Sequence, residues 1–421
     1  MLLCLLLPTG AYAQGLPEPL TLDAALATAG NTQHYSLIDV DERLQAIEAS
    51  ASILEAENGF KLNLKGRLRE VGQSQAAGGG SAGDSAASLV LSRPVYDFGQ
   101  SSAEENLLVM QARALQIERA YLIEQRHLSI LDKYFSVLNA DNAFITANEA
   151  LAIGFIRFDR AQERQELGLA AEIEVRRLQA EYEVIRQQLF LAQHQQRLSR
   201  ALLAEEMGFP EQPPSDLESP TIDADKKIST KFESLYERAM QHSLAAARIK
   251  LQTDIAAATI RIGENSDNPS VDFEVEASSY ERDSQLRDEW RASLYVDIPL
   301  FGKSTDAATS LHKANYRQVL SQQQRFQTRL RLQLLELWQA IQQWQLTASG
   351  AEVAQNYREM YLDRSRAEYE LEFNTDLGDS MIEYSRSNAA RLEAVYAFEL
   401  NYRKLAALVG DEFLQNAAPA Q

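Results

Sequence analysis

Apolar and polar residues alternate one by one in four short stretches of this chain. In one of them, Val271, Phe273 and Val275 alternate with acidic residues. A period of two places one set of side chains on each face of a β-strand. Four strands are therefore predicted, at about 60–73, 88–96, 271–280 and 289–299. Each strand would have one apolar face and one polar face.

Most of the remaining chain has the period of an amphipathic helix, because apolar residues recur at steps of three and four. Helices are predicted at about 22–57, 100–167, 172–207, 232–262 and 304–371, and again from the break at 373–378 to 409. They form two long helical hairpins, at about 100–207 and 304–409. Helices of this length need a partner along their whole face, as in a coiled coil.

The same order of elements occurs twice: helix, two strands, very long helix, helix. Three pairs of motifs mark the duplication: Leu22–Ala27 with Phe232–Ala239, Pro94–Gly99 with Pro299–Gly302, and Leu203–Gly208 with Leu405–Gly410. The predicted division is a first repeat at 14–210, a linker at 211–230, a second repeat at 231–410 and a tail at 411–421. Strand-to-helix turns are predicted at Pro94, Gly99, Pro299 and Gly302, where glycine supplies backbone freedom.

The chain starts with a short apolar run that ends in Ala11-Tyr12-Ala13, a pattern typical of a signal peptide at 1–13. After this segment no stretch approaches the ~18 apolar residues of a membrane helix. An exported chain without such helices can span a membrane only as a closed β-barrel.

Strands of about ten residues with one apolar face suit a tilted membrane-spanning strand. Four strands cannot close a barrel, because about eight are needed even for a barrel filled by side chains. Unpaired strand edges in lipid would cost several kcal/mol per backbone group. The strands are therefore predicted to complete their barrel with other copies of the chain. The alternative is a solvated sheet in a soluble protein, which leaves the continuous apolar face unexplained.

The polar faces of the strands are predicted to line the lumen of that barrel. The first hairpin is cationic on this face and the second is anionic, so opposite charges are expected to pair between neighbouring strands. The predicted lumen residues are Lys61, Lys65, Arg67, Arg69, Asp272, Glu274 and Glu276.

Composition argues against several other functions. The formal net charge of −19 opposes nucleic-acid binding, which needs clustered cationic surface. The only cysteine, Cys4, lies in the predicted signal peptide, which excludes disulfides and thiol metal sites from the mature chain. The five histidines are scattered without metal-ligand spacing, and no phosphate loop or nucleophile elbow is present. No enzymatic activity, cofactor or metal is predicted.

The order and spacing of these motifs resemble the TolC family of outer-membrane efflux proteins. The resemblance covers about Leu20 to Gly410, and its most telling stretches are Leu20–Leu26, Pro94–Gln100 and Glu166–Val175. It implies a mostly α fold with a transmembrane β part: a homotrimer with a twelve-stranded β-barrel in the outer membrane and an α-helical barrel in the periplasm. It also implies an exit duct of a tripartite efflux pump or type I secretion system. The partners would be a periplasmic adaptor, an inner-membrane pump of ABC, RND or MFS type, and outer-membrane lipids.

The resemblance places a pore constriction at the far ends of the helical hairpins, here Gly168–Val175 and Tyr369–Ser380. Its predicted residues are Asp376, Asp379, Glu172, Glu174 and Tyr369. Asp376 and Asp379 are three residues apart, so one helical face can present both. Rings of carboxylates at a narrow mouth would bind cations and repel anions. The family's tip arginine is Asn374 in this chain and its glycine is Glu372. The alternative for the two aspartates is that they are solvated carboxylates at a helix start.

A second function stays open at this stage, that of a non-channel periplasmic scaffold or adaptor of an export complex. Such an adaptor would have one helical hairpin enclosed by small β-domains. This chain has two predicted hairpins, and each follows a pair of strands.

Overall fold

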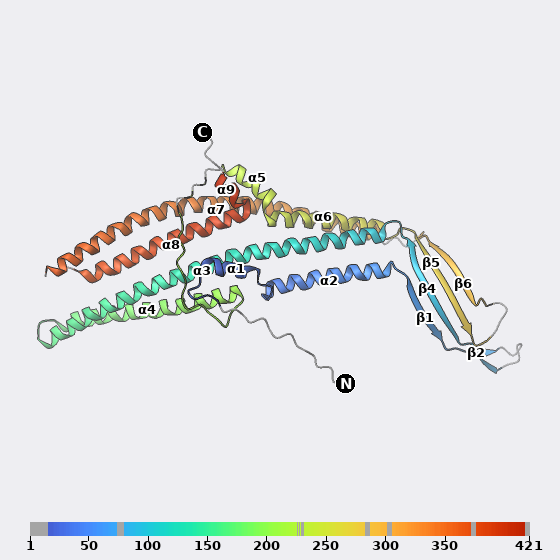
Figure 1. The fold of residues 1–421 in the computed structure, drawn as a ribbon, viewed down its shortest axis with the longest axis horizontal. Helices are drawn as coiled ribbons and strands as arrows, with labels where there is room; N and C mark the ends of the chain where they lie inside the picture. Colours follow the sequence, from blue (N-terminus) through green and yellow to red (C-terminus); the bar gives the residue numbers. More distant parts are fainter. Residues whose placement is uncertain are drawn as a thin grey trace. The chain divides into compact units, whose positions relative to one another are not determined.

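The computed structural model describes residues 16–73, 80–224, 226, 228, 231–282, 287–300, 305–371 and 376–416 (Figure 1). The predicted signal peptide lies outside these residues. The chain forms two compact units. One unit contains the larger β-sheet and comprises Asp39–Ala120 and Leu244–Arg329. The other is helical and comprises Met1–Ile38, Tyr121–Ser243 and Leu330–Gln421. Helices α3 (Gln100–Glu166) and α7 (Thr305–Glu370) contribute residues to both units.

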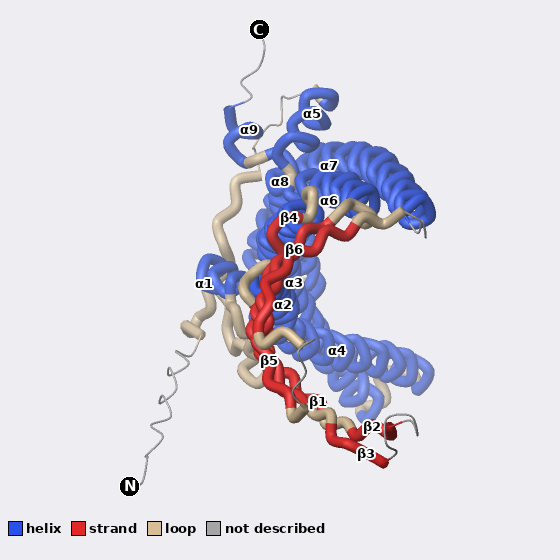
Figure 2. Tube along the Cα trace, turned by 90° about the vertical axis from the view of Figure 1, so that its right-hand side faces the viewer, coloured by secondary structure: helices blue, strands red, loops and turns tan. Residues whose placement is uncertain are grey.

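The sheet unit contains an antiparallel four-stranded sheet with the order β1-β4-β5-β6 (Figure 1), and its strands are drawn in red in Figure 2. The strands are β1 (Lys61–Arg67), β4 (Ala86–Tyr96), β5 (Ser270–Tyr280) and β6 (Trp290–Asp297). Helix α2 (Tyr35–Glu57) precedes β1, and α6 (Leu244–Asn265) precedes β5. Each hairpin of the duplicated sequence therefore supplies two neighbouring strands.

The first predicted strand, at about 60–73, is not continuous but is interrupted after Arg67. Its part within the sheet ends at Arg67, and β2 (Glu70–Gln73) pairs with β3 (Gly80–Gly83) in a separate two-stranded sheet. The Asp84 amide donates to the Arg69 carbonyl at 2.7 Å, in the same register as the β1–β4 and β2–β3 pairs. The β2–β3 pair therefore continues the first hairpin beyond the four-stranded sheet.

The position of Pro94 also corrects a prediction. It lies inside β4, opposite Asp272, at a register shift between Pro94 and Tyr96. Proline has no amide hydrogen to give to the ladder, and an irregularity of this kind accommodates it within a strand. The turn to α3 therefore begins later, at Asp97.

The helical unit contains α1 (Leu22–Ala27), η1 (Thr28–Gly30), α4 (Glu172–Met207), α5 (Phe232–His242), α8 (Leu377–Val409) and α9 (Asp411–Asn416). Within it, α4 runs beside α3 and α8 runs beside α7 (Figure 1). Glycines in the left-handed conformation follow α3 and α4, at Gly168 (φ +72°) and Gly208 (φ +87°), where a side chain would be strained.

Two helices predicted as continuous are divided. The helix expected at 22–57 is broken between η1 and α2, where Asn31 is extended (ψ 111°). The helix expected at 232–262 is broken at Ser243, which is also extended (ψ 138°). An extended residue cannot continue the helical hydrogen-bond ladder, so each break starts a new helix. The tail expected at 411–421 begins with α9.

The core of the helical unit joins α3 to the segments that cross it. Ile130, Tyr134 and Leu203 are fully buried in a cluster with Leu20 and Met207. The Tyr134 hydroxyl lies 2.8 Å from the Leu20 carbonyl oxygen and 2.6 Å from that of Glu218. These contacts hold the N-terminal segment and the 211–230 linker against α3. No helix in the described part of the chain is both long enough and apolar enough to cross a membrane.

Candidate functional site

The four-stranded sheet has one face made almost entirely of apolar side chains. The register puts Leu62, Leu91, Val275 and Ala292 in one row across all four strands, and Leu64, Leu89, Ala277 and Trp290 in the next. This surface is open: Leu64 is 79% exposed and Trp290 is 71% exposed. Contiguous apolar surface of this kind marks a site of contact with protein or membrane.

The opposite face is polar and its charges pair differently from the prediction. The cationic β1 and the anionic β5 are not neighbours, because β4 lies between them. Glu276 of β5 instead forms an ion pair with Arg291 of β6 at 2.5 Å. On the other side of β5, toward β1, Glu274 stands opposite the uncharged Ser92 of β4. The expected pairing between hairpins was wrong, because alternation within a strand does not determine which strands become neighbours.

Arg69 lies apart from the other predicted lumen cations. It follows β1, and its guanidinium is 3.6 Å from the buried carboxylate of Asp84. Arg287 contacts the same carboxylate at 2.5 Å. These residues tie the segments that follow β1 and β5 to each other, a contact that the sequence analysis did not predict.

The sheet also has two free edges. Among the strands that the structure describes, β1 pairs only with β4, and β6 pairs only with β5. Along both strands nearly every side chain is exposed. Each edge therefore offers a row of backbone donors and acceptors for another strand.

The turn from β4 into α3 is built around Asp97 and Gly99. Gly99 is in the left-handed conformation (φ +92°), and its amide donates to the Asp97 carboxylate at 3.1 Å. The same carboxylate accepts from the Ser101 amide at 2.6 Å and so caps the start of α3. Gly99 is thus a turn residue, as predicted. Pro299 follows β6, and Gly302 lies outside the described residues.

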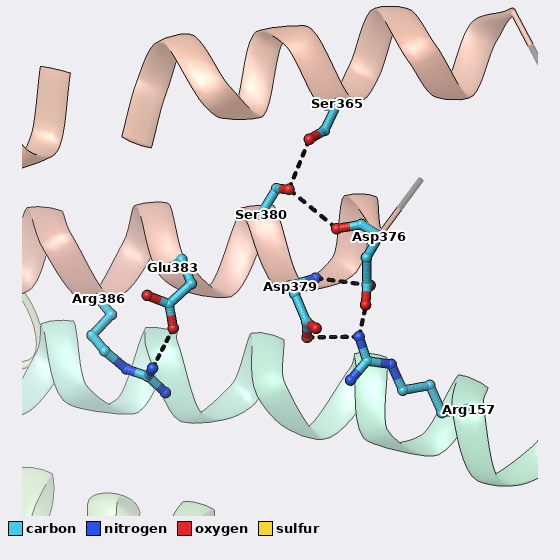
Figure 3. Close-up of polar contacts among 7 residues, drawn as sticks. All are labelled: Arg157, Ser365, Asp376, Asp379, Ser380, Glu383 and Arg386. Atoms are coloured by element: carbon cyan, nitrogen blue, oxygen red, sulfur yellow. Dashed lines mark hydrogen bonds and ion pairs between the residues drawn. The ribbon is translucent and has the colours of Figure 1, made fainter. Parts of the chain in front are cut away.

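The second cluster lies at the start of α8. Asp376 is the N-cap of this helix, and its side chain accepts a hydrogen bond from the Asp379 amide at 3.3 Å. Arg157, which projects from α3, donates to Asp376 at 2.7 Å and to Asp379 at 2.6 Å (Figure 3). One guanidinium thus links the two predicted constriction aspartates to α3.

The two carboxylates have pKa values that move in opposite directions. Burial raises the pKa of Asp376, but hydrogen bonds with Asp379 and the charge of Arg157 outweigh burial and hold it below its ordinary value. Burial, together with the hydrogen bond to Asp376, holds the pKa of Asp379 above its ordinary value. Asp376 therefore carries the negative charge more firmly, and Asp379 is the first of the two to take up a proton.

Two further contacts fix α8 between its neighbours. The hydroxyls of Ser365 in α7 and Ser380 in α8 are buried and lie 2.8 Å apart (Figure 3). On the side toward α3, a Cβ atom on Gly378 would lie 2.7 Å from Ile153. The start of α8 is therefore bonded to α7 and packed closely on α3.

The other predicted constriction residues lie apart from this cluster. Glu172 and Glu174 are exposed in the first turn of α4, and Glu172 pairs with Arg176 of its own helix at 3.6 Å. Tyr369, near the end of α7, is 58% exposed. Asn374 and Glu372 lie outside the described residues.

Arg157 is the residue of this cluster that the sequence analysis missed. It lies in the interior of a long helix, in which charged residues are frequent, and about 219 positions separate it from Asp376 in the chain. No local signal distinguishes it from the other arginines of α3. Among the described residues, no group of three histidine, cysteine or acidic side chains could hold a metal ion.

Comparisons with known proteins identify the fold. No protein-family model and no curated protein matches the sequence. Among solved structures, the outer membrane protein VceC from Vibrio cholerae matches with a TM-score of 0.70 and 19% identity, over 92% of this chain and 96% of that one. The chain has the fold of outer-membrane channel proteins.

Two further channels show the same likeness. The CmeC outer membrane channel of Campylobacter jejuni matches with a TM-score of 0.74 and 12% identity, over 95% of this chain and 87% of that one. The open state of the Neisseria gonorrhoeae MtrE outer membrane channel gives a TM-score of 0.69 and 14% identity, over 94% and 90%. The resemblance predicted from the sequence is thus confirmed for the fold.

Proposed function

We propose that this chain is one subunit of a trimeric exit duct that lies in the outer membrane and extends into the periplasm. The observation that carries the proposal is the sheet whose apolar face is exposed from one free edge to the other. Apolar surface gains ~25 cal/mol per Å² when it leaves water, so a face of this extent favours lipid. The polar face would then line an aqueous lumen.

The free edges support assembly with further copies. Unpaired backbone groups in lipid cost several kcal/mol each, so β1 and β6 need partner strands once the sheet enters the membrane. Neighbouring copies of the chain can supply a partner strand to each edge, and a closed ring of copies leaves no edge unpaired. Three copies would give a twelve-stranded barrel, the number that the resemblance to the TolC family implies.

We infer that cargo passes through this duct passively, in a tripartite efflux pump or a type I secretion system. A periplasmic adaptor and an inner-membrane pump would supply the energy and the selection of cargo. The scaffold alternative is less favoured, because the chain matches outer-membrane channels over more than nine tenths of its length.

The Arg157 cluster is proposed as the closing contact at the periplasmic mouth. Arg157 forms ion pairs with Asp376 and Asp379, offsets one of their two negative charges and ties α8 to α3. All three side chains are at least 40% exposed, so water weakens the ion pairs to roughly 0–1 kcal/mol each. A contact of that strength can hold a mouth closed and still yield to a partner that binds the open form more tightly.

Substitutions on adjacent residues of β1 test the membrane assignment. Leu64 belongs to the apolar face and Asn63 to the polar face, and both are exposed. A lysine on the lipid-facing side of a barrel costs roughly 2–4 kcal/mol near the membrane midplane, whereas the lumen tolerates it. We expect Leu64→Lys to reduce the amount of heat-modifiable trimer in outer-membrane fractions, and Asn63→Lys to leave it unchanged.

The two variants are matched in strand, exposure and introduced charge. If the sheet were solvated, lysine at Leu64 would be at least as well tolerated as lysine at Asn63. Equal trimer yields from both variants, or recovery of the wild-type protein only as a soluble monomer, would therefore contradict the proposed function.

A further inference from the structure

The two free edges of the sheet carry opposite charges at the same end. Strand β1 begins at Lys61, directly after α2, and β6 ends at Asp297. Both side chains are exposed. In the part of the chain that the structure describes, neither Lys61 nor Asp297 takes part in an ion pair. Each edge thus ends in a charge that has no counter-ion among the described residues of its own copy.

The register places these two charges on the same face. Lys61, Ser92, Glu274 and Ser293 form one row across the sheet. Asp297 stands opposite Ser270, which is four residues before Glu274 in β5. An even separation along a strand keeps side chains on one face, so Asp297 shares the polar face with Lys61.

Closure into a barrel determines how far the rows shift between copies. Barrel strands tilt by ~35–45°. Across the ~19 Å width of four strands, this tilt moves a row by ~13–19 Å along the strands, which is about four to six residues. Only an even shift keeps polar side chains on the lumen side, so the shift at each seam is about four or six residues.

The direction of the shift follows from handedness. The Ser278 amide donates to the Glu289 carbonyl at 2.8 Å, which defines the side of β5 on which β6 lies when the polar face is viewed. The right-handed twist of strands makes them tilt in one sense around a barrel. With this direction of tilt, the row that ends at Ser293 continues in β1 of the next copy, at a position about four or six residues after Lys61.

Asp297 then meets the basic start of β1 in either register. A shift of about four residues brings it opposite Lys61 of the next copy. A shift of about six brings it opposite Asn63, with Lys61 as a diagonal neighbour. A diagonal separation of ~7–8 Å between Cα atoms is within reach of a long side chain.

We propose that Lys61 of one copy and Asp297 of the next form an ion pair across each seam of the barrel, on the lumen face. The partner is a second copy of this chain, and the inference rests on the proposed trimeric duct. The charges distinguish this head-to-tail register from a shift of about two residues. That smaller shift would bring Lys65 opposite Arg291 and place like charges together.

Cysteine pairs test this geometry in the full-length protein, whose only native cysteine lies in the predicted signal peptide. We expect oxidation to give covalent trimers with Asp297→Cys combined with either Lys61→Cys or Asn63→Cys. Mixing one copy that carries only Asp297→Cys with one that carries only the β1 cysteine should give covalent dimers and no trimers. Lys61→Cys with Glu289→Cys is the control, since that crosslink requires the opposite direction of shift.

Charge exchange tests the energetics. Lys61→Asp and Asp297→Lys should each lower the temperature at which the detergent-resistant trimer dissociates, and the double variant should recover most of the loss. Lys313 pairs with Glu264 of its own copy at 3.7 Å, so Lys313→Asp should not rescue Asp297→Lys. Suppose that the wild type forms a membrane trimer, but the cysteine variants give no crosslink and the charge-exchanged double variant gives no rescue. That result, or a crosslink found only with Glu289→Cys, would overturn the seam pair alone. A wild-type protein that forms no membrane trimer would overturn the proposed function as well.

Discussion

Gly378 of α8 lies so close to Ile153 of α3 that a Cβ atom in its place would be 2.7 Å from the Ile153 side chain. The contact is next to the ion pairs that Arg157 makes with Asp376 and Asp379. Close packing and charge therefore act at the same point, where α8 begins. The absence of a side chain at position 378 allows α8 to come close enough for Arg157 to reach both carboxylates.

Gly378→Ala is expected to push α8 away from α3 and weaken the Arg157 contacts. In planar bilayers the variant should open more often than the wild type, because the closed contact is strained. Gly350→Ala is the matched control, since a Cβ on Gly350 meets nothing within 4 Å. That control should be neutral or stabilising by roughly 0.5–1 kcal/mol. Indistinguishable openings for the two variants would show that the close approach has no part in closure.

Arg157→Gln is expected to increase the open fraction of the channel, because it removes both ion pairs between α3 and α8. The free energy of unfolding should change by no more than about 2 kcal/mol per copy, since each of the two ion pairs joins partly exposed side chains. Arg176→Gln is the control, because Arg176 pairs with Glu172 inside a single helix. Single-channel recording distinguishes the two, and an unchanged open fraction in Arg157→Gln would exclude Arg157 from the gate.

Asp376→Asn is expected to lower the free energy of unfolding more than Asp379→Asn does at neutral pH. Asp376 is the N-cap of α8 and the more firmly ionised partner of Arg157. Asparagine is an equally good N-cap, so Asp376→Asn keeps the cap hydrogen bond and removes only the charge that Arg157 stabilises. Asp379→Asn removes an ion pair but also relieves the repulsion between the two carboxylates. Denaturation of the two variants would check the order, and a larger loss from Asp379→Asn would contradict the assigned roles.

Mild acid is expected to leave the Arg157–Asp376 contact in place. The pKa of Asp376 is lowered, so its stabilising charge is lost only as the pH falls through that lowered value, below the ordinary 3.8. The pKa of Asp379 is raised above 3.8, so it takes up its proton first and the repulsion within the pair is relieved. The open fraction of the channel should therefore stay constant from neutral pH down to the ordinary range of aspartate pKa values. A steep opening well above that range would contradict this order of protonation.

Arg126→Met is expected to destabilise the helical unit by roughly 2–4 kcal/mol. Arg126 is only 4% exposed and donates to the Ala29 carbonyl at 2.6 Å and to the Glu206 carbonyl at 2.9 Å. Its removal leaves these buried acceptors without a donor. Arg43→Met is the control, since its side chain is 60% exposed and its ion pair with Asp39 spans 3.7 Å. Equal melting temperatures would show that Arg126 has no such structural role.

The sequence by itself determined the local features of this protein. Alternation along β5 and β6 predicted their two faces, and the helix ends predicted at about 167 and 207 are followed by left-handed glycines at 168 and 208. These features depend on residues that are near one another in the chain, and each has a period or a backbone conformation that a few side chains reveal.

Only the tertiary structure decided which elements became neighbours. It placed β4 between β1 and β5, so that Glu276 pairs with Arg291 and not with a cation of the first hairpin. It also brought Arg157 of the first half of the chain to Asp376 of the second, across 219 positions. Strand order and helix packing are set by the burial of whole faces, and a single charged residue in a long helix carries no local mark of the partner that packing will bring to it.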